Sequence, residues 1–404
     1  MSKYIVITGG QLYNKGAEAM TYLAVDELTK KYPEAKIVVL STKDFERPEY
    51  EKKKYKFEIL PRESRVLFPL TTGKLKVRGY LQQLKSLLRK DKSYIKETYR
   101  LKKILKNTIM MVDISGFALS SQFNSEHSVN YLSRIFIAEN YNIPFYIMPQ
   151  SFGPFNYDTE IQMNMDKIIK KALSYPKVIY AREKEGYSLL KNNFSLDLNL
   201  KYSMDSVLVT NDINLKNIFT EIPVTKKYPE AKGVAIVPNM KTFSHGNKEV
   251  ILKTYKNVID NLILKGKTVT IVRHSYEDIE ACLMIKDLFN EDDSVVLIGD
   301  DMSCIEFDNL VTQFDFIIGS RFHSIVHAYK NAVPSIALGW ATKYKELLEE
   351  FNQSGYIFDV RKNINQKDII AKVNYLLDNH EYESTVIAER LNKIQSSNPY
   401  NSIT

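Results

Sequence analysis

Short apolar runs rich in Val and Ile recur along the chain, and most of them are separated by stretches with an amphipathic helical pattern. Five runs lie in the first half, "YIVIT", "KIVVL", "IMMVD", "PFYIM" and "VIYA". Five more lie in the second half, "GVAIV", "TVTIV", "SVVLI", "FDFII" and "SIAL". Segments 17–31, 161–173 and 248–265 are the clearest helical stretches. Strands that alternate with helices predict parallel sheets with helices on both faces.

Two such series predict an α/β fold of two Rossmann-like domains with a cleft between them. The chain has 404 residues, which is too long for one ordinary hydrophobic core. The break between the domains is expected in segment 211–232, which is polar and carries two prolines. We predict an N-terminal domain over 1–215, a C-terminal domain over 230–375, and a helix or tail over 376–404 that packs back on the N-terminal domain.

Composition excludes several classes of protein. Hydrophobic residues are 44% and charged residues 26%, which is typical of a globular protein. No apolar stretch approaches the roughly 20 residues that span a bilayer. The start, "MSKYIVITGGQ", is typical of a first strand, since a secretory signal needs a longer apolar region. The two cysteines, Cys282 and Cys304, have no metal-ligand spacing, so we expect a reduced cytoplasmic location and no metal.

The positive charge is concentrated in segment 51–106, which resembles an insertion in the N-terminal domain. It holds 18 Lys and Arg and 5 Asp and Glu, a net +13, so the rest of the chain carries −5 of the total +8. Within it, Val77, Leu81, Leu84 and Leu88 form an apolar stripe at helical spacing. Segment 74–106 therefore fits contact with an anionic membrane at its inner face, or packing on its own domain, which we favour. No recognition module accompanies the charge, so nucleic acid is not expected.

Ligands of open parallel sheets bind beyond the carboxyl ends of the strands, so the residues after each apolar run matter most. After "YIVIT", the stretch "GGQLYNKGAEAM" combines a glycine turn with a helix start, which favours an anion or simply close strand–helix packing. Residues of similar placement in the N-terminal half are Asn14, Gly16, Glu18, Asp113, Ser115 and Gln150. Arg182 follows "VIYA" and leads into a helix, so it binds either an anionic ligand or the nearby Glu183 or Glu185.

In the C-terminal half, "DFIIGSRFHSIVHAYKNAVPSIALGW" places Arg321 and His323 at a predicted strand-to-helix turn. A planar guanidinium binds carboxylate and phosphate groups bidentately, and a histidine pKa near neutrality suits a proton donor. The alternative is a helix cap and a structural hydrogen bond. Arg273 and His274 follow "TVTIV", and His245 follows "GVAIV", so all three are expected to face the same cleft.

Five blocks in order resemble those of the polysaccharide pyruvyl transferase family. The first is "GGQLYNKGAEAM", which is similar to an Asn-x-Gly-Asp-Glu-Ala signature, with Ala17 in place of the frequent Asp. "DISGFALS", "QSFGPF" and "AREKEGYSLL" resemble the next three blocks, with departures at Phe117, Glu183 and Gly186. "SRFHSIVHAYKNAVPSIAL" with "TKYKELLEEF" is the best match and carries Lys343. The blocks cover most of the chain, but none lies in segment 51–106.

The resemblance implies transfer of pyruvate from phosphoenolpyruvate to two hydroxyls of a sugar, which forms a cyclic ketal, and a GT-B-like fold. The acceptor would be a capsule or exopolysaccharide glycan or its lipid-linked precursor, and phosphoenolpyruvate would serve as co-substrate without a further cofactor. His323 would be the acid, with Arg321, Arg182, Arg273, His274 and His245 around the donor. Lys343 would lie on a loop of the cleft, on the acceptor side with the residues of the N-terminal half named above. Asp113, Glu18 and His274 all remain open as the base.

Two other functions fit the same pattern. The first is a GT-B glycosyltransferase that uses a nucleotide sugar, in which Glu346 or Glu349 would bind the ribose hydroxyls. The second is a binding protein that keeps the fold without catalysis. The Arg321 and His323 pair favours a small dianionic donor over both.

Overall fold

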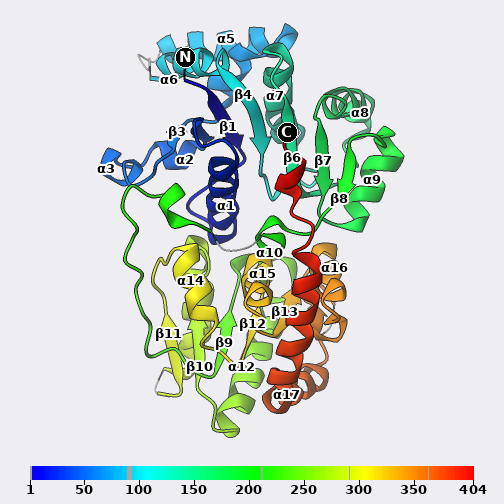
Figure 1. The fold of residues 1–404 in the computed structure, drawn as a ribbon. Coiled ribbons are helices and arrows are strands. Elements are labelled where there is room, and N and C mark those ends of the chain that lie inside the picture. The colour runs from blue at the N-terminus through cyan, green and yellow to red at the C-terminus, as the bar shows by residue number, and fades with distance from the viewer. Residues whose placement is uncertain (1, 89–92, 211–212, 291, 363) are drawn as a thin grey trace.

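The computed structural model describes residues 2–88, 93–210, 213–290, 292–362 and 364–404. It has two α/β domains, with the N-terminal domain above the C-terminal domain in Figure 1. Each domain is built on one parallel sheet, which confirms the predicted fold class. Residues 89–92 of the basic segment and 211–212 of the predicted break lie outside the described residues.

The N-terminal sheet has eight strands in the order β3-β2-β1-β4-β6-β7-β8, and β5 pairs with β6 beside this path. All pairings between these strands are parallel. The strands are β1 (Tyr4–Thr8), β2 (Lys36–Leu40), β3 (Glu58–Leu60), β4 (Thr108–Asp113), β5 (Phe117–Leu119), β6 (Phe145–Phe152), β7 (Val178–Ala181) and β8 (Leu200–Tyr202). Successive strands are added to one side of β1 up to β3 and to its other side from β4 on, so the switch point where ligands of such sheets bind lies between β1 and β4.

The C-terminal sheet repeats this arrangement with six parallel strands in the order β11-β10-β9-β12-β13-β14. The strands are β9 (Val234–Val237), β10 (Val269–Val272), β11 (Val295–Ile298), β12 (Phe316–Gly319), β13 (Ser335–Gly339) and β14 (Ile357–Asp359). Its switch point lies between β9 and β12. The carboxyl ends of β9 and β12 therefore correspond to those of β1 and β4.

Helices cover both sheets. Those of the N-terminal domain are α1 (Lys15–Lys31), α2 (Thr42–Phe45), α3 (Glu49–Lys52), α4 (Ser64–Leu67), α5 (Gly73–Leu88), α6 (Ser93–Leu105), α7 (Ser125–Asn140), α8 (Thr159–Leu173), α9 (Lys184–Phe194) and α10 (Ser206–Val209). Those of the C-terminal domain are α11 (Met240–His245), α12 (Lys248–Leu264), α13 (Ile279–Lys286), α14 (Cys304–Val311), α15 (Phe322–Lys330), α16 (Thr342–Glu350) and α17 (Gln366–Ile394). No helix in the described part of the chain has both the length and the apolar character of a membrane span.

All ten apolar runs of the sequence form strands. Four further strands, β3, β5, β8 and β14, have only three residues each and carry no clear apolar run. One of them, β3, lies inside segment 51–106 and forms an edge of the N-terminal sheet. The basic segment therefore contributes one strand to the sheet, and α5 and α6 are its longer helical part outside the sheet.

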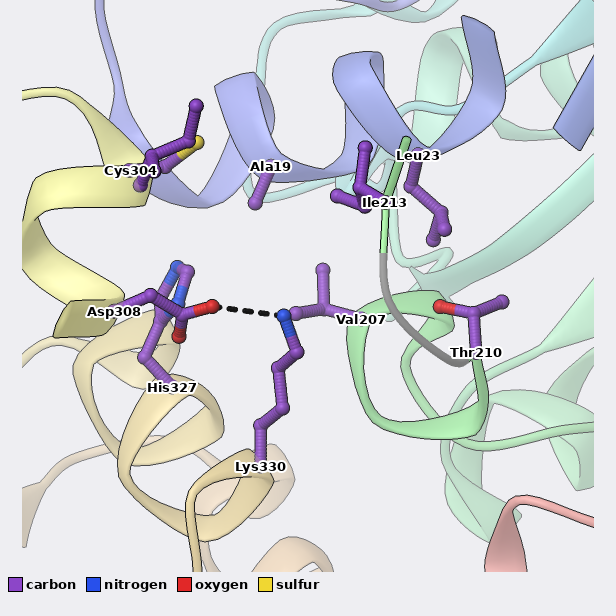
Figure 2. Close-up of a pocket in the computed structure, with 10 residues that line it drawn as sticks. Ala19, Leu23, Val207, Thr210, Ile213, Cys304, Asp308, His327 and Lys330 are labelled. Carbon is purple, nitrogen blue, oxygen red and sulfur yellow. Dashed lines mark hydrogen bonds and ion pairs between the residues drawn. The ribbon is translucent and has the colours of Figure 1, made fainter. Parts of the chain in front are cut away.

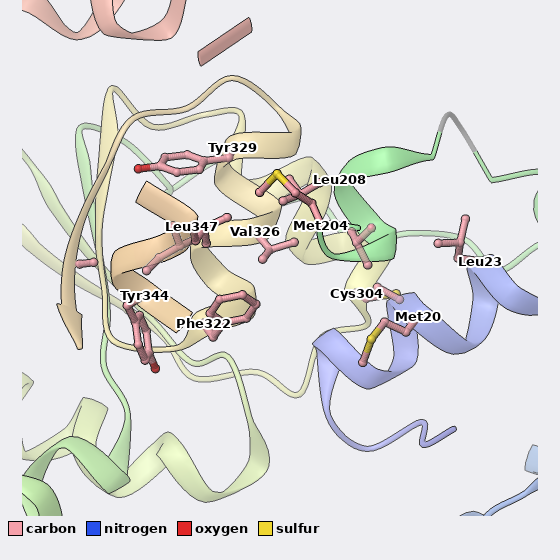
Figure 3. Close-up of a cluster of buried hydrophobic side chains, with 14 of the residues drawn as sticks. Met20, Leu23, Met204, Leu208, Cys304, Phe322, Val326, Tyr329, Tyr344 and Leu347 are labelled. Atoms are coloured by element: carbon pink, nitrogen blue, oxygen red, sulfur yellow. The ribbon is translucent and has the colours of Figure 1, made fainter. Parts of the chain in front are cut away.

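The two domains share a hydrophobic core. Met20 and Leu23 of α1 lie opposite side chains of α15 and of the segment leading into α10 (Figure 3). Leu208 of α10 is fully buried in the same cluster as Val326 of α15. Because this cluster is continuous between the domains, residues on α1, α10 and α15 are held together at the cleft.

The C-terminal tail returns to the N-terminal domain, and Figure 1 shows it beside β6. The Tyr146 hydroxyl donates a hydrogen bond of 2.8 Å to the carbonyl oxygen of Thr404. The Asn398 side-chain amide donates to the Glu27 carboxylate at 2.9 Å. Lys31 also donates to the carbonyl oxygen of Ile403. The tail therefore links the C-terminal domain to the N-terminal domain.

Candidate active site between the two domains

The centre of the candidate site is the turn between β12 and α15. Gly319 ends the strand, Arg321 is the N-cap residue of α15, and His323 lies in the first turn of this helix. The Ser324 hydroxyl donates to the carbonyl oxygen of Arg321 at 2.7 Å, which closes the turn. His323 is thereby directed from the C-terminal domain toward α1 of the N-terminal domain.

His323 packs directly on the backbone of Gly16. A Cβ atom at Gly16 would lie 2.1 Å from Cγ of the His323 ring, so only glycine leaves room for this contact. Asn14 caps α1 by accepting a hydrogen bond of 3.1 Å from the Gly16 N–H, and its backbone forms a bridge with Ser275 of the C-terminal domain. Asn14 and Gly16 therefore hold the two domains together at the position of His323.

Asp205 joins His323 to Arg182. Its Oδ2 lies 3.4 Å from Nε2 of His323 and accepts a hydrogen bond of 2.6 Å from Nη1 of Arg182. Burial by itself raises the pKa of the Asp205 carboxyl, but His323, Arg182 and the N–H of Val207 outweigh it and hold the pKa well below its ordinary value. Asp205 is therefore an anion beside the imidazole, while Nε2 of His323 has no partner in hydrogen-bond geometry within the described residues.

Arg182 has partners for every nitrogen of its guanidinium. Beside Asp205, it donates from Nε to Glu183 at 3.0 Å and from Nη2 to the Ser151 hydroxyl at 2.6 Å. Its guanidinium carbon lies 4.4 Å from the ring centre of Phe322. The structure therefore favours the ion-pair alternative for Arg182, whose present role is to position Asp205 and Glu183.

Arg321 is also paired with carboxylates. Nε donates to Asp278 at 2.7 Å, and Nη2 donates to Asp278 at 2.6 Å and to Glu277 at 2.5 Å. Asp278 is fully buried, so the bidentate pair holds the loop after β10 against the turn after β12. Within the described residues, Nη1 is the nitrogen of Arg321 that has no protein partner.

Lys343 is a cation without a carboxylate partner in the described part of the chain. Its Nζ lies 5.1 Å from the ring centre of Phe322, 5.8 Å from that of Tyr344 and 6.0 Å from that of Phe117, which belongs to the N-terminal domain. Burial, followed by the positive charge of Arg182, lowers the pKa of Lys343 to about 8. A bound anion would stabilise the charged form of this amine.

Arg273 and His274 lie at the carboxyl end of β10. Arg273 donates to the carbonyl oxygens of Ser275 and Gly299 at 3.3 and 3.0 Å. Burial, followed by the charge of Lys15, lowers the pKa of His274 well below its ordinary value, so its ring is neutral. Nε2 of His274 is buried and has no hydrogen-bond partner in the described structure.

His245 is exposed and stacks on Trp340, with ring centres 4.8 Å apart. Trp340 contacts Tyr344, and Tyr344 contacts Phe322, so three aromatic rings separate His245 from His323. Trp340 also lines an open hollow at the ends of β13 and β14. The structure therefore places His245 at the edge of this hollow and apart from the His323 cluster.

The other predicted site residues of the N-terminal domain lie in two groups. Asp113, Ser115 and Gln150 surround Arg134 of α7, which donates to Asp113 at 2.8 Å and to Ser115 at 3.0 Å. Gln150 donates to Asp113 at 3.2 Å. Glu18 lies elsewhere, where its carboxylate accepts from Tyr22 and from the N–H of Cys304, both at 2.7 Å, and burial raises its pKa.

Sequence reasoning missed four charged residues of the cleft. Asp205 follows β8, Arg62 follows β3, Asp278 lies in the loop after β10, and Arg134 lies within α7. The first two follow strands of three residues, which leave no signal in the sequence. The Arg62 guanidinium has no hydrogen bond or ion pair in the described residues, and burial, then Arg134, lowers its pKa to about 10.

The cavities at the domain interface are small. A narrow pocket beside His323 is lined by Arg182, Asp205, Phe322, Lys343 and Glu346, among others. A second pocket lies between α1, α10, α14 and α15, where Asp308 forms an ion pair of 2.8 Å with Lys330 (Figure 2). The described residues contain no group of three or more His, Cys, Asp or Glu side chains that could hold a metal.

Comparison with solved structures supports the architecture. The MnaA structure from S. aureus with UDP covers 98% of this chain and 92% of its own at 13% identity, with a TM-score of 0.53. Anabaena Alr3699/HepE with UDP and glucose covers 100% and 97% at 8% identity, with a TM-score of 0.54. The UDP-GlcNAc 2-epimerase of Methanocaldococcus jannaschii covers 94% and 93% at 13% identity, with a TM-score of 0.55. These likenesses show a GT-B-type fold.

Family comparison gives the stronger assignment. No curated protein sequence matches this chain significantly. The sequence profile described as "Polysaccharide pyruvyl transferase" matches residues 14–342, which include Asn14, Arg182, Asp205, Arg321 and His323. The predicted resemblance is thereby confirmed, and the chain belongs to the polysaccharide pyruvyl transferase family.

Proposed function

We propose that this protein transfers pyruvate from phosphoenolpyruvate to two hydroxyls of a sugar and releases inorganic phosphate. The observation that carries the proposal is the contact of His323 with the buried Asp205 anion, beside the amine of Lys343, which has no carboxylate partner in the described structure. A proton donor and an available cation are the two groups that an enol phosphate needs.

The proposed reaction forms one C–H bond and two C–O bonds. His323 gives a proton to the methylene carbon, and a first sugar hydroxyl adds to the neighbouring carbon through a new C–O bond. The bond from that carbon to the phosphate oxygen then breaks, phosphate leaves with the electron pair, and the second hydroxyl closes the ketal. One hydroxyl proton restores His323 through a base or water, and the other leaves with phosphate or the base.

The environment of His323 favours protonation of the imidazole when the donor binds. Burial lowers the pKa of His323 while Asp205 opposes this effect, so the imidazole without donor is mostly neutral at neutral pH. A bound phosphate dianion favours the imidazolium. We infer that Lys343 and Nη1 of Arg321 bind the anionic groups of the donor, because neither nitrogen has a carboxylate partner in the described residues.

Among the three candidates for the base, the contacts favour His274. Asp113 accepts hydrogen bonds from Arg134, Gln150 and the N–H of Ser115. Glu18 is held by Tyr22 and Cys304. Nε2 of His274 has no partner in the described structure, and its lowered pKa keeps the ring in the proton-accepting form.

Phosphate release from phosphoenolpyruvate tests the proposal. Purified protein is incubated with phosphoenolpyruvate and a panel of free and lipid-linked glycans, and the ketal is sought by mass spectrometry. We expect phosphate release that depends on one acceptor class and is lost in His323→Ala. Donor binding without phosphate release across acceptors that bind would instead support a binding protein.

A GT-B glycosyltransferase is the second candidate, because S. aureus MnaA and Anabaena HepE bind UDP in their structures. The Glu346 carboxylate, which would have to bind ribose, instead accepts from the N–H groups of Lys184 and Glu185 at 2.5 and 3.0 Å. Glu349 lies 3.6 Å from Lys345. Thermal stabilisation by a UDP-sugar and none by phosphoenolpyruvate would favour this candidate.

A further inference from the structure

Helix α5 has an inverted amphipathic arrangement. Its apolar stripe faces solvent, with Val77 60%, Leu81 55%, Leu84 54% and Leu88 79% exposed. Tyr80 on the same side is 52% exposed. A surface helix of a globular protein normally buries such a stripe against its own core. The helix does pack on its own domain, as we favoured from the sequence, but it does not use this stripe to do so.

The opposite face of α5 is small and polar, and it is this face that packs on the domain. A Cβ atom at Gly79 would lie 2.4 Å from the backbone nitrogen of Pro69, so the helix backbone rests directly on residues 68–70. The Gln83 amide donates to the carbonyl oxygen of Arg65 at 3.0 Å and to the Thr98 hydroxyl at 2.9 Å. These specific contacts fix the rotation of α5 and leave its leucines outward.

Cations flank the apolar stripe. Lys74, Lys76 and Lys85 of α5 are exposed and have no ion-pair partner in the described residues. Arg78 is paired with Glu126 at 2.5 Å, so it contributes less free charge. The neighbouring α6 adds further exposed basic residues, Lys96, Lys102 and Lys103, whereas Arg100 is paired with Glu58 at 3.0 Å. An exposed apolar stripe with basic borders is the arrangement of helices that lie in a membrane interface.

We propose that α5, with basic residues of α6, docks the protein on an anionic lipid bilayer. The leucines would enter the boundary between headgroups and acyl chains, while the lysines contact lipid phosphates. A second copy of this chain is the less suitable occupant, because it would bring two sets of lysines together. Figure 1 shows α5 and α6 at the end of the N-terminal domain away from the C-terminal domain, so docking there does not cover the interface between the domains.

Co-sedimentation with lipid vesicles tests this proposal without any substrate. Vesicles contain either phosphatidylcholine alone or two parts phosphatidylcholine to one part phosphatidylglycerol. The charge variant carries Lys74→Gln, Lys76→Gln and Lys85→Gln, and the stripe variant carries Leu81→Gln, Leu84→Gln and Leu88→Gln. The control variant carries Leu198→Gln and Leu264→Gln, which change leucines that are exposed elsewhere. Thermal unfolding checks that all variants are folded.

We expect wild type and the control to bind the anionic vesicles and not the neutral ones. Losing three cations should lower the partition coefficient about a hundredfold, and losing three leucines should lower it by at least as much. Equal partitioning of wild type and both variants would refute the docking surface. A dimer in light scattering that the stripe variant dissociates, without vesicle binding, would assign the stripe to a second copy.

An environment-sensitive dye gives a second measurement. Cys282 and Cys304 are both buried, so a cysteine introduced on the surface can be labelled selectively. A nitrobenzoxadiazole label at Leu84→Cys should shift to the blue with anionic vesicles, because its position enters the apolar layer. The same label at Leu264→Cys should show no shift. Equal shifts at the two positions, or none at Leu84→Cys, would contradict insertion of α5.

Discussion

The two switch points of the molecule have the same topology but opposite distributions of charge. After β4, the strand end supplies the carboxylate of Asp113, and Arg134 on a helix neutralises it. After β12, the strand end supplies Arg321, and Asp278 from a neighbouring loop neutralises it. Both pairs are buried or nearly so; the first joins β4 to α7, and the second joins the loop after β10 to the turn after β12.

This comparison separates cations that hold the structure from cations that are available to ligands. The arginines nearest the strand ends already have carboxylate partners. The side chains that have none in the described residues follow other strands, Lys343 after β13 and Arg62 after β3. We therefore expect Lys343 to serve the donor and Arg62 an anionic group of the acceptor, with His323 between the two domains.

The largest effect is expected from replacing His323, which tests whether the proton donor lies only at the C-terminal switch point. His323→Ala should lower turnover about 10²–10⁴-fold, with a smaller change in donor affinity. His323→Gln should retain donor affinity and stay slow, because an amide cannot deliver a proton by titration. Turnover and the dissociation constant of phosphoenolpyruvate are measured for both variants.

The matched change in the N-terminal switch point is Ser115→Ala, which removes a hydroxyl that Arg134 contacts. We expect it to change turnover much less than His323→Gln. Wild-type turnover should also fall as pH rises through the pKa of His323 in the donor complex, since the acid form is then lost. Near-normal turnover of His323→Gln would make His323 a binding residue.

The second expected effect compares the two cations that lack carboxylate partners. Lys343→Gln should weaken binding of phosphoenolpyruvate by about 1.5–3 kcal/mol, which is typical of one lost charge-assisted hydrogen bond. Arg62→Gln should leave donor binding unchanged and weaken an anionic acceptor. Calorimetry with phosphoenolpyruvate and steady-state kinetics in the acceptor measure the two affinities.

The direction in which donor affinity changes with pH provides a further test of Lys343. The pKa of Lys343 is about 8, so the free enzyme loses this positive charge as pH rises through that value. Affinity of wild type for phosphoenolpyruvate should therefore fall above pH 8, and Lys343→Gln should lack this decrease. An unchanged affinity of Lys343→Gln at neutral pH would remove Lys343 from the donor site.

The third expected effect concerns the two paired arginines. Arg321→Lys and Arg134→Lys should each reduce the free energy of unfolding by about 1–3 kcal/mol, because lysine cannot replace all the hydrogen bonds to a buried carboxylate. Only Arg321→Lys should also weaken phosphoenolpyruvate binding, because Nη1 is lost. Equal donor affinity in the two variants would mean that Arg321 acts only through its pair with Asp278.

Much of the fold could be predicted from the sequence because it depends on local pattern. Runs such as "YIVIT" and "FDFII" are long enough to define buried parallel strands, and their spacing leaves room for one helix between strands. The site could be predicted in part, since the turn that carries Arg321 and His323 follows such a run. The rotation of α5 could not, because its stripe looks the same whether it faces the core or solvent.

The partners of the charged residues could not be predicted either. Asp278 lies 43 residues before Arg321, and Asp205 lies 23 residues after Arg182, so each pair forms only when the sheets bring their loops together. The arginine most conspicuous in the sequence is therefore the one already neutralised. Asp205 and Arg62 are missed because the strands that place them, β8 and β3, are too short to leave a pattern.

The smallest expected effect tests the contact by which the N-terminal switch point accommodates His323. In Gly16→Ala, the new Cβ would overlap the imidazole ring at 2.1 Å, and the ring or α1 must move. Overpacking of this kind costs about 1–3 kcal/mol, and the higher helix propensity of alanine returns up to about 1 kcal/mol. Gly116→Ala is the matched control, because its Cβ would meet only the flexible end of Met20 at 3.2 Å. We expect Gly16→Ala to lower both the thermal midpoint and turnover, and Gly116→Ala to change neither appreciably. Gly16→Ala with normal turnover would show that His323 need not rest on α1 to act.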